Sequence, residues 1–565
     1  MTLPSTDTTI AHTPRRLVVL AAIVALAGAL TLGLATRHAE GASPKNVIFI
    51  LTDDQTAGEL AVMPNTQALI GSQGASFRRA YVSYPLCCPA RATLLSGQYM
   101  HNHGVRGNLP PFGGWENFKA HESNALPVWT GDSGHYNVHI GKYMNGYGPT
   151  VSDPRPVPDG WDEWYGRISD GGVYFNYSLF EQTGPGDTPE VKFYPGEPSN
   201  YQTDVFGRKA EEFIEGLDSS EEPFMMNVWF NAPHGPFEPA PRHLFTLSGT
   251  SLPRVPGFNE KNISDKPRWL QKQARRRLGK GVKRTITNER LRREEQLLSV
   301  DEAVRGIVDA LSEKGVLEET YIIFASDNGF FRGEHRIIGG KYLPYDPSSK
   351  VPLLIRGPGI PAGAVSDELV SLTDVPETIL DIAGSPDPSL DGRSLLPYAQ
   401  NPGARSARPI LFEADTGPSR GNTGPESASA ASLAHSAIAK VRLAGRKGVK
   451  NLDQEKNPIK SLKSVANSNF APAYKAIRTD RYLYVLYANG QTELYDMLYD
   501  PFQLRSLAAN KRFNPVRKYL FNALLYFSTC AGAGCRSDLP PEPLPLPKPK
   551  PKPEPKKDAK GEPRP

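Results

Sequence analysis

Short runs of consecutive apolar residues, many of them β-branched, recur along the interior of the chain. The first is Val47 to Leu51, and similar runs follow at residues 224–230, 321–324 and 351–355. Uninterrupted runs of this length are typical of strands that are buried on both faces of a parallel sheet. Helical patterns lie between them, such as the apolar positions three and four residues apart from Leu297 to Leu311, with Gly315 as a stop signal. The pattern therefore predicts an α/β fold, in which helices flank a large, mostly parallel sheet.

After about residue 400 the pattern changes to short segments separated by turns. A loop rich in Gly, Ser, Pro and Ala occupies residues 415–431. Short strands are then expected at residues 474–478, 482–487 and 493–495, and a closing helix at 516–527. We therefore expect a main α/β domain at residues 43–400 and a C-terminal α+β subdomain with a smaller antiparallel sheet at residues 401–538.

The two ends of the chain differ from the body in composition. Arg15 and Arg16 precede an uninterrupted run of apolar and small residues from Leu17 to Ala35. Residues 1–42 are therefore expected to be a signal peptide or an N-terminal membrane anchor, and the protein to be secreted or held at the cell surface. Contact with a membrane is expected only through this segment, if it stays uncleaved. Residues 539–565, rich in Pro and Lys, are expected to be a disordered, extended tail.

Charge is distributed unevenly along the 565 residues, of which 39% are apolar and 22% charged, a globular composition. Of the formal net charge of +5, residues 540–565 contribute +3 and residues 1–42 contribute +1. The body between them therefore carries only +1, and no nucleic-acid partner is expected. The four cysteines are too few for a disulfide scaffold and lack the paired spacing of a zinc ribbon.

Polar side chains follow four of the predicted strands at the point where each strand ends. They are Asp53 and Asp54, Lys142, His234, and Asp327 with Asn328. Because ligands bind beyond the carboxyl ends of parallel strands, we expect these side chains to share one rim of the sheet. Three carboxylates and an amide oxygen suit a hard cation such as calcium or magnesium. A soft metal is disfavoured because His and Cys do not cluster with them.

The segment from Leu86 to Gly97 has the pattern of a helix that begins at a cysteine pair. Pro89 suits its first turn and Gly97 suits its end. Cys87 would then lie at the helix N-terminus, where unpaired N–H groups attract an anion, and Arg91 would lie one turn further on the same face. Taken alone, the cysteine pair indicates no more than two buried residues that open a core helix.

This segment resembles the signature of the sulfatases, Cys-x-Pro-Ser/Ala-Arg followed by a Ser/Thr-Gly pair. Further segments that match the family are Asp53-Asp54, Asp327-Asn328-Gly329, residues 351–359, residues 493–496 and Asp500-Pro501. The resemblance runs from about Asn46 to Cys535 and implies the alkaline-phosphatase-like superfold. Within the family, residues 86–89, 99–103 and 141–145 and the pair Cys530 and Cys535 look most like the N-acetylglucosamine-6-sulfatases and extracellular heparan endosulfatases.

The resemblance implies a sulfuric ester hydrolase that uses a modified cysteine and a bound calcium ion. Cys87 would be oxidised to formylglycine by a formylglycine-generating enzyme, whereas Cys88 lacks the required spacing. The implied calcium ligands are Asp53, Asp54, Asp327, Asn328 and the modified Cys87. The implied catalytic and substrate-binding residues are Arg91, Lys142, His234 and Lys341, with Asn145 in place of a histidine that many sulfatases carry. Cys530 and Cys535 are expected to form a disulfide.

The implied substrate is an aryl sulfate or a 6-O-sulfated aminosugar, as a small molecule or within a sulfated glycan. Loops at residues 104–118 and 165–193 are expected to select it. Two other functions stay open: a phosphodiesterase or phosphonate hydrolase of the same superfold, and an inactive glycan-binding relative. Asn328 argues against the first, because two-metal members tend to place a histidine there. Residues 271–293, with ten Lys or Arg and one acid, are either a solvated helix face or a contact for a sulfated polysaccharide.

Overall fold

A computed structural model of the protein describes residues 1–2, 45–148, 157–168, 173–218, 222–250, 254–415 and 471–545. The chain divides into two units, residues 1–44 and 45–565, and nearly all of the described residues belong to the second. The predicted export segment, most of the loop at 415–431 and the tail beyond residue 545 lie outside the described residues. None of the described helices combines the length and apolar character that crossing a bilayer requires.

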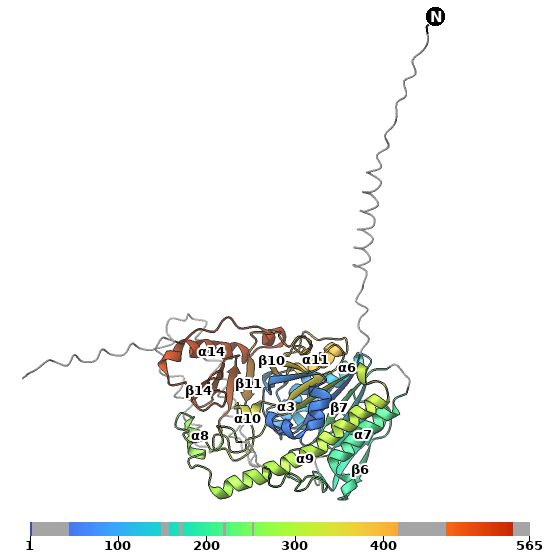
Figure 1. Ribbon diagram of the computed structural model, residues 1–565, viewed down its shortest axis with the longest axis horizontal. Coiled ribbons are helices and arrows are strands. Elements are labelled where there is room, and N and C mark those ends of the chain that lie inside the picture. Colours follow the sequence, from blue (N-terminus) through green and yellow to red (C-terminus); the bar gives the residue numbers. More distant parts are fainter. Residues whose placement is uncertain are drawn as a thin grey trace, which may run out of the picture. The chain divides into compact units, whose positions relative to one another are not determined.

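A ten-stranded sheet forms the core of the second unit (Figure 1). Its strands lie in the order β10-β2-β9-β8-β1-β7-β3-β4-β5-β6. Their bounds are β1 Asn46–Thr52, β2 Ala75–Tyr81, β3 Tyr136–Gly141, β4 Glu163–Arg167, β5 Tyr177–Gln182, β6 Glu190–Tyr194, β7 Phe224–Trp229, β8 Thr320–Ser326, β9 Leu353–Arg356 and β10 Ala364–Ser371. The central strands β8, β1, β7, β3 and β4 are parallel, whereas β9, β5 and β6 run antiparallel to their neighbours. The predicted fold class, a mostly parallel sheet, is confirmed.

Strand β1 shows why helices cover both faces of this sheet. Val47, Phe49 and Leu51 pack on one side into a core that includes residues of α3, α6 and α11. Ile48 and Ile50 pack on the other side with residues of α7 and α9. These helices are α3 Cys87–Ser96, α6 Leu126–Asp132, α11 Asp374–Ile382, α7 Gln202–Gly216 and α9 Lys280–Glu313. All five β1 side chains are fully buried, and each contributes about 1.5–3 kcal/mol through burial.

Helix α9 is much longer than the apolar pattern alone predicts. Leu297, Val304 and Leu311 are fully buried against the sheet, as their spacing indicates. The helix nevertheless begins at Lys280, and its first half carries no continuous apolar stripe that would have predicted it. It ends near Gly315, whose φ of +77° favours glycine.

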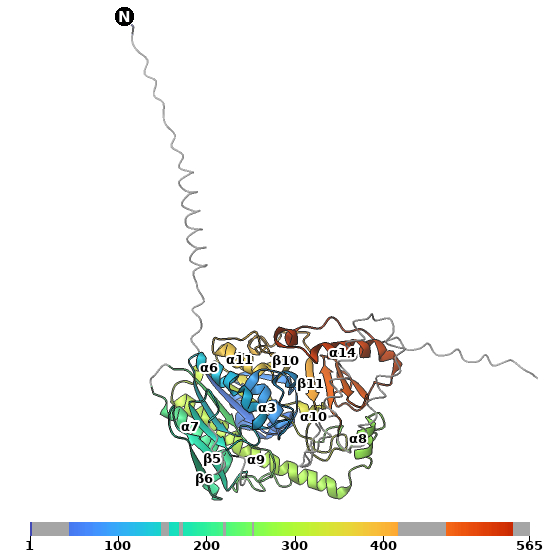
Figure 2. The ribbon, with the colours of Figure 1, turned by 180° about the vertical axis from the view of Figure 1, so that it is seen from behind.

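A second, four-stranded antiparallel sheet follows in the order β11-β12-β13-β14 (Figure 2). Its strands are β11 Ile410–Ala414, β12 Tyr474–Arg478, β13 Tyr482–Tyr487 and β14 Thr492–Asp496, and helix α14 spans Asn514–Phe527. Leu520 and Phe527 of α14 pack with Ile477 of β12 in one core. The smaller antiparallel sheet and its closing helix are thus present, whereas the exact domain boundary at residue 400 stays a prediction.

Residues 165–193 differ from the long substrate loop that was expected there. Part of this range forms β4, which is parallel to β3, and β5 and β6, which extend the edge of the large sheet as antiparallel strands. Tyr177 and Tyr194 stack with their ring centroids 5.2 Å apart, which ties β5 to β6. Short helices complete the body: α2 Pro64–Thr66, α4 Met100–His103, α5 Trp115–Phe118, α8 Arg268–Gln273, α10 Asp346–Ser349 and α12 Leu396–Gln400.

Candidate active site

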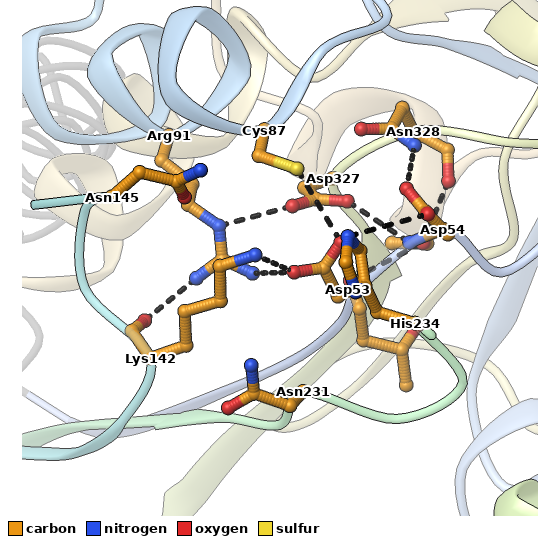
Figure 3. A network of polar contacts seen from close by, with 12 residues as sticks. Asp53, Asp54, Cys87, Arg91, Lys142, Asn145, Asn231, His234, Asp327 and Asn328 are labelled. Carbon is orange, nitrogen blue, oxygen red and sulfur yellow. Dashed lines mark hydrogen bonds and ion pairs between the residues drawn. The ribbon is translucent and has the colours of Figure 1, made fainter. Parts of the chain in front are cut away.

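Four neighbouring parallel strands deliver the predicted polar residues to one rim of the sheet. The strands are β8, β1, β7 and β3. Asp53 and Asp54 come after β1, Asp327 and Asn328 after β8, Lys142 after β3 and His234 after β7. Figure 3 shows the carboxylates of Asp53, Asp54 and Asp327 lying close to one another beneath the start of α3. The parallel topology therefore assembles the cluster that the sequence analysis predicted.

Arg91, on the second turn of α3, binds two of these carboxylates. Its Nε donates to Asp327 Oδ2 at 3.0 Å and its Nη2 to Asp53 Oδ2 at 3.4 Å. Its Nη1 donates to the carbonyl oxygen of Lys142 at 2.6 Å. All three charged side chains are fully buried, so each charge depends on its partner for stabilisation. Arg91 consequently holds α3, β1, β3 and β8 in register around the site.

Two lysines reach the same carboxylates. Lys142 forms an ion pair with Asp53, and Lys341 forms one with Asp54. Lys341 Nζ also lies 2.8 Å from Cys87 Sγ. Burial alone would lower the pKa of each lysine, but the adjacent carboxylates outweigh it and raise both pKa values. Both ammonium groups are therefore charged at neutral pH.

Cys87 is the first residue of α3, as the motif predicted, and faces the carboxylates (Figure 3). Its Sγ lies 3.5 Å from Asp53 Oδ1, and the residue is 1% exposed. Burial, followed by the charge of Asp53, raises the pKa of the thiol to about 12. The unmodified thiol is therefore protonated at neutral pH and is a weak nucleophile.

The carboxylates form a donor set for a hard cation. Asp53, Asp54 and Asp327 each offer an oxygen, and the three atoms lie within 4.8 Å of one another. Asn328 Nδ2 donates to Asp54 Oδ1 at 2.5 Å, while Asn328 Oδ1 is buried without a hydrogen-bond partner among the described residues. Asp54 adopts a φ of +74°, an uncommon conformation that turns the chain at the rim. Three carboxylates and a free amide oxygen fit a divalent cation with a preference for oxygen ligands.

The positive and negative side chains of the cluster balance one another without a metal ion. Three carboxylates face three cations, namely Arg91, Lys142 and Lys341. Burial would raise the pKa of Asp53, but the surrounding positive groups hold it well below its usual value. Burial and the charge of Asp53 raise the pKa of Asp327. A divalent cation added to this balanced cluster would leave a surplus of two positive charges, which suits an anionic ester.

Three further side chains line the rim with unused hydrogen-bonding capacity. His234 is 37% exposed, and its Nε2 lies 3.9 Å from Asp54 Oδ2. The Oδ1 atoms of Asn145 and Asn231 are buried without hydrogen-bond partners among the described residues. Asn145 was predicted as a site residue, whereas Asn231 was not selected, although it comes two residues after β7 and lies beside the cluster (Figure 3).

A buried ion cluster behind the rim escaped the sequence analysis. Arg293 of α9 donates to the carbonyl oxygens of Asp54 at 2.6 Å and Pro233 at 3.2 Å, and to Glu59 at 3.0 Å. Glu59 also pairs with Arg332 at 2.8 Å. Burial would raise the pKa of Glu59, but the two arginines lower it to about 2. Arg293 was counted with the basic stretch, because its partner lies 234 residues away and leaves no local signal.

The two C-terminal cysteines do not belong to the cluster around Asp53, Asp54 and Asp327. Cys530 and Cys535 are joined by a disulfide with their Cα atoms 5.1 Å apart. The carbonyl oxygen of Cys530 lies 2.8 Å from His101 Nε2, and His101 Nδ1 lies 2.7 Å from Glu413. This group connects α4 with β11 and with the end of the chain beyond α14.

Comparison with known proteins identifies the family. The sulfatase family model matches residues 45–385, which contain every predicted site residue apart from the disulfide cysteines. The N-acetylglucosamine-6-sulfatase of Capra hircus is 31% identical over 519 residues, which is 88% of this chain and 86% of that relative. An extracellular sulfatase Sulf-1 homolog of Caenorhabditis elegans is 34% identical over 359 residues, 63% of this chain and 49% of the relative. The matched part thus spans about half the length of that relative.

Solved structures share the fold at lower identity. One, a complex with its substrate D-glucosamine-2-N,6-O-disulfate, has a TM-score of 0.62 and 22% identity over 85% of this chain and 97% of its own. The phosphonate monoester hydrolase of Agrobacterium radiobacter has a TM-score of 0.58 and 21% identity over 85% of this chain and 95% of its own. The fold alone therefore does not separate sulfate from phosphonate esters. The family match extends over more than half of the chain and includes Asp53, Asp54 and Asp327. The chain belongs to the sulfatase family.

Proposed function

We propose that this protein hydrolyses sulfate esters, with a nucleophile made from Cys87 and with a bound calcium ion. The observation that carries the proposal is the position of Cys87 at the N-terminus of α3, against Asp53 and 2.8 Å from Lys341. Sulfate transfer requires a nucleophile, positive charge around the sulfate oxygens and a proton for the leaving alcohol. Side chains suited to all three tasks lie on this one rim.

The nucleophile would be formylglycine, made by oxidation of Cys87 during maturation. The thiol itself, with a pKa of about 12, is unsuited to attack at neutral pH. A hydrated aldehyde at this position would supply a hydroxyl oxygen for attack on sulfur. The helix N-terminus favours the negatively charged sulfate there. Cys88 is also buried, but its Sγ accepts a hydrogen bond from the backbone N–H of Asn145 at 3.2 Å, which marks it as a packing residue.

Calcium fits the donor set of the rim. Asp53, Asp54, Asp327 and Asn328 would hold it, with the modified Cys87 as a further ligand. When bound, the ion would draw electron density from the sulfate oxygens. The unpaired Oδ1 of Asn328 supports this assignment, since a buried acceptor without a donor is costly unless a ligand meets it.

The remaining side chains would orient the ester and handle protons. Lys142 and Lys341 would contact sulfate oxygens with their ammonium groups. His234, which is the most exposed member of the group, would protonate the leaving alcohol together with Lys341. Burial lowers the pKa of His234, so its imidazole is neutral at rest and would first take up the proton of the attacking hydroxyl before passing it to the leaving alcohol. The unpaired acceptors of Asn145 and Asn231 would receive hydrogen bonds from substrate hydroxyl groups.

The substrate would be a 6-O-sulfated aminosugar or an aryl sulfate. Relatives named N-acetylglucosamine-6-sulfatase and arylsulfatase support this choice. The relatives named as extracellular sulfatases support a secreted location. Maturation would need a formylglycine-generating enzyme as a transient partner.

Sulfate release tests the proposal directly. The purified chain is expected to release sulfate from an aryl sulfate and from glucosamine 6-sulfate, and Cys87→Ala is expected to abolish both. Cys88→Ala is the matched control, because it removes the adjacent buried thiol and is expected to retain turnover. Peptide mass spectrometry is expected to show a loss of about 18 Da at Cys87, the difference between cysteine and formylglycine. Full activity of Cys87→Ala would refute the mechanism.

Phosphonate or phosphodiester hydrolysis is the second candidate, since the fold also supports that chemistry. It would require faster turnover of a phosphonate monoester than of the sulfate ester, and metal analysis would find two transition-metal ions per chain. An inactive glycan-binding protein is the third candidate. It would show Cys87 unmodified in the native protein and no turnover of either ester.

A further inference from the structure

We propose that the exposed basic segment that runs from the end of α8 into the first two turns of α9 is a binding surface for a polysulfated glycan chain. We define this basic arm by its seven cations: Lys272, Arg275, Arg276, Arg277, Lys280, Lys283 and Arg284. The idea that such a chain is also the substrate rests on the proposed sulfate ester hydrolysis. Binding by the arm does not depend on turnover and can be measured separately.

The charges of the basic arm have no acidic partners among the residues that the structure describes. Six of the seven side chains are exposed and Lys283 is half-buried. Within the part of the chain that the structure describes, no carboxylate lies within ion-pair distance of any of them. The later cations of the same stretch differ, because Arg290 pairs with Glu294 and Arg292 with Glu295. The unpaired cations repel one another, so binding a polyanion would relieve their repulsion.

The arm is held in place by buried contacts beneath it. Arg336 donates to the carbonyl oxygens of Ala274 and Arg275, each at 3.3 Å. The backbone N–H of Leu278 donates to Asn259 Oδ1 at 2.7 Å, and Leu278 is 9% exposed. The exposed cations therefore project from a fixed backbone. Such preorganisation lowers the entropic cost of binding a chain.

The same contacts connect the arm to the catalytic lysine. Arg336 lies five residues before Lys341, a distance of at most about 18 Å along an extended chain. Hydrogen bonds between Phe331 and Gly340 and between Gly333 and Ile337 hold this segment as a loop, with Arg336 near its tip and Lys341 just beyond its base. Helix α10, just beyond Lys341, lies between α3 and α8 in both views (Figures 1 and 2). A polysaccharide long enough to span this loop would therefore contact the arm and the active site together.

A sulfated glycan fits these observations better than a nucleic acid. The adjacent active site has the charge and donor groups for single sulfate esters, and a polymer that carries many of them would meet both sites at once. The body of the protein has a net charge of only +1, so the arm is a local feature of an otherwise balanced surface. Nucleic-acid-binding domains usually combine such a basic patch with a strongly basic charge of the whole domain.

A charge-reversal variant tests the surface in the full chain. The variant Arg275→Glu, Arg276→Glu, Arg277→Glu changes exposed side chains whose own polar atoms make no described contacts. The matched control is Arg505→Glu, Lys511→Glu, Lys518→Glu, which makes the same charge change at exposed positions in and before α14. Both are made with and without Cys87→Ala, so that heparin binding is measured without turnover. Unfolding curves confirm that the variants fold.

We expect the arm variant to elute from immobilised heparin at lower salt than the wild type and the control variant. Its kcat/KM for a heparin-derived polysaccharide should fall at least about tenfold at low salt, with the difference shrinking as salt rises. Its kcat/KM for a small aryl sulfate should stay unchanged. Equal heparin affinity of the two variants, or equally tight binding of double-stranded DNA of matched charge, would overturn the proposal. If the wild type hydrolysed no sulfate ester but the arm variant still lost heparin affinity, the proposed function would fail while the binding surface stood.

Discussion

Replacement of Arg293 by methionine tests how α9 supports the rim that carries Asp53 and Asp54. Methionine retains much of the side-chain volume and the apolar contact with Phe330, whose ring centroid lies 4.6 Å from the guanidinium. It removes the donors that meet Glu59 and the carbonyl oxygens of Asp54 and Pro233. Glu59 would keep Arg332 as its only ion-pair partner among the described residues. The substitution thus leaves a buried carboxylate and two buried carbonyl groups under-satisfied.

The structure sets the size of the effect. The pKa of Glu59 is lowered from 4.5 to about 2, so its native interactions stabilise the folded state by about 3 kcal/mol at neutral pH. Removal of one partner from a buried ion pair costs about 3–5 kcal/mol in general. With an unfolding entropy of about 2.1 cal/mol/K per residue, this loss lowers Tm by roughly 3–4 °C in a chain of this length.

The dependence on pH separates this mechanism from simple loss of packing. Because the folded pKa of Glu59 is depressed, its contribution is present above pH 4.5 and is lost as the pH falls toward about 2. The difference in unfolding free energy between wild type and Arg293→Met should therefore be largest near pH 7 and should shrink below pH 4.5. Denaturant unfolding at pH 7, 5, 4 and 3 measures it.

A surface arginine on the same helix is the control. Arg305 is 65% exposed and pairs with Asp309 at 3.3 Å, so Arg305→Met should change stability by less than about 0.5 kcal/mol. The reasoning fails if Arg293→Met matches Arg305→Met at pH 7. It also fails if a large difference between wild type and Arg293→Met stays constant down to pH 3.

Three further predictions concern the metal, a second buried pair and a helix terminus. A calcium chelator should abolish sulfate release, and added calcium should restore it. The Asp327→Asn variant should need at least about tenfold more calcium than the wild type for half-maximal activity and for half-maximal thermal stabilisation. Lys475→Met should lower the unfolding free energy by about 3 kcal/mol, because it leaves Glu413, which is 1% exposed, without its ammonium partner. Gly97→Ala should lower it by at least about 1 kcal/mol, because φ there is +64° and a Cβ atom would lie 2.8 Å from Leu390; unchanged unfolding curves would contradict either stability estimate.

The cluster of Asp53, Asp54 and Asp327 was predictable because the carboxyl ends of neighbouring parallel strands meet at one edge of the sheet. Asp53 and Asp327 each follow a buried apolar run, and parallel neighbours end at the same rim. The bounds of α3 were predictable from the local sequence, because Pro89 suits its first turn and Gly97 its end. Lys341 follows no strand, so only the family resemblance pointed to it, and its contacts come from a loop that the apolar pattern does not describe.

Other features lack a local signal. Strand β2 mixes Arg and Ser with apolar residues, and β6 is exposed over most of its length, so neither shows a buried apolar run. The partner of Arg293 is set by tertiary packing, because Glu59 belongs to a short turn after β1 rather than to the same helix. A run of cations in a sequence therefore does not tell which of them are buried. Only the fold separates Arg293 from Arg275.

The positive charges of the molecule thus fall into two groups, one buried and paired with carboxylates and one at the surface. Arg91, Lys142 and Lys341 are buried against carboxylates, where salt screens them little, and in the proposed function they surround one sulfate group. The cations of the basic arm are exposed, lack described acidic partners and are open to screening. The first group can fix the geometry of one ester at any ionic strength, whereas the second can attract and hold a long polyanion only while salt is low. A net charge of +1 over the body conceals both groups, because it sums balanced and unbalanced charges alike.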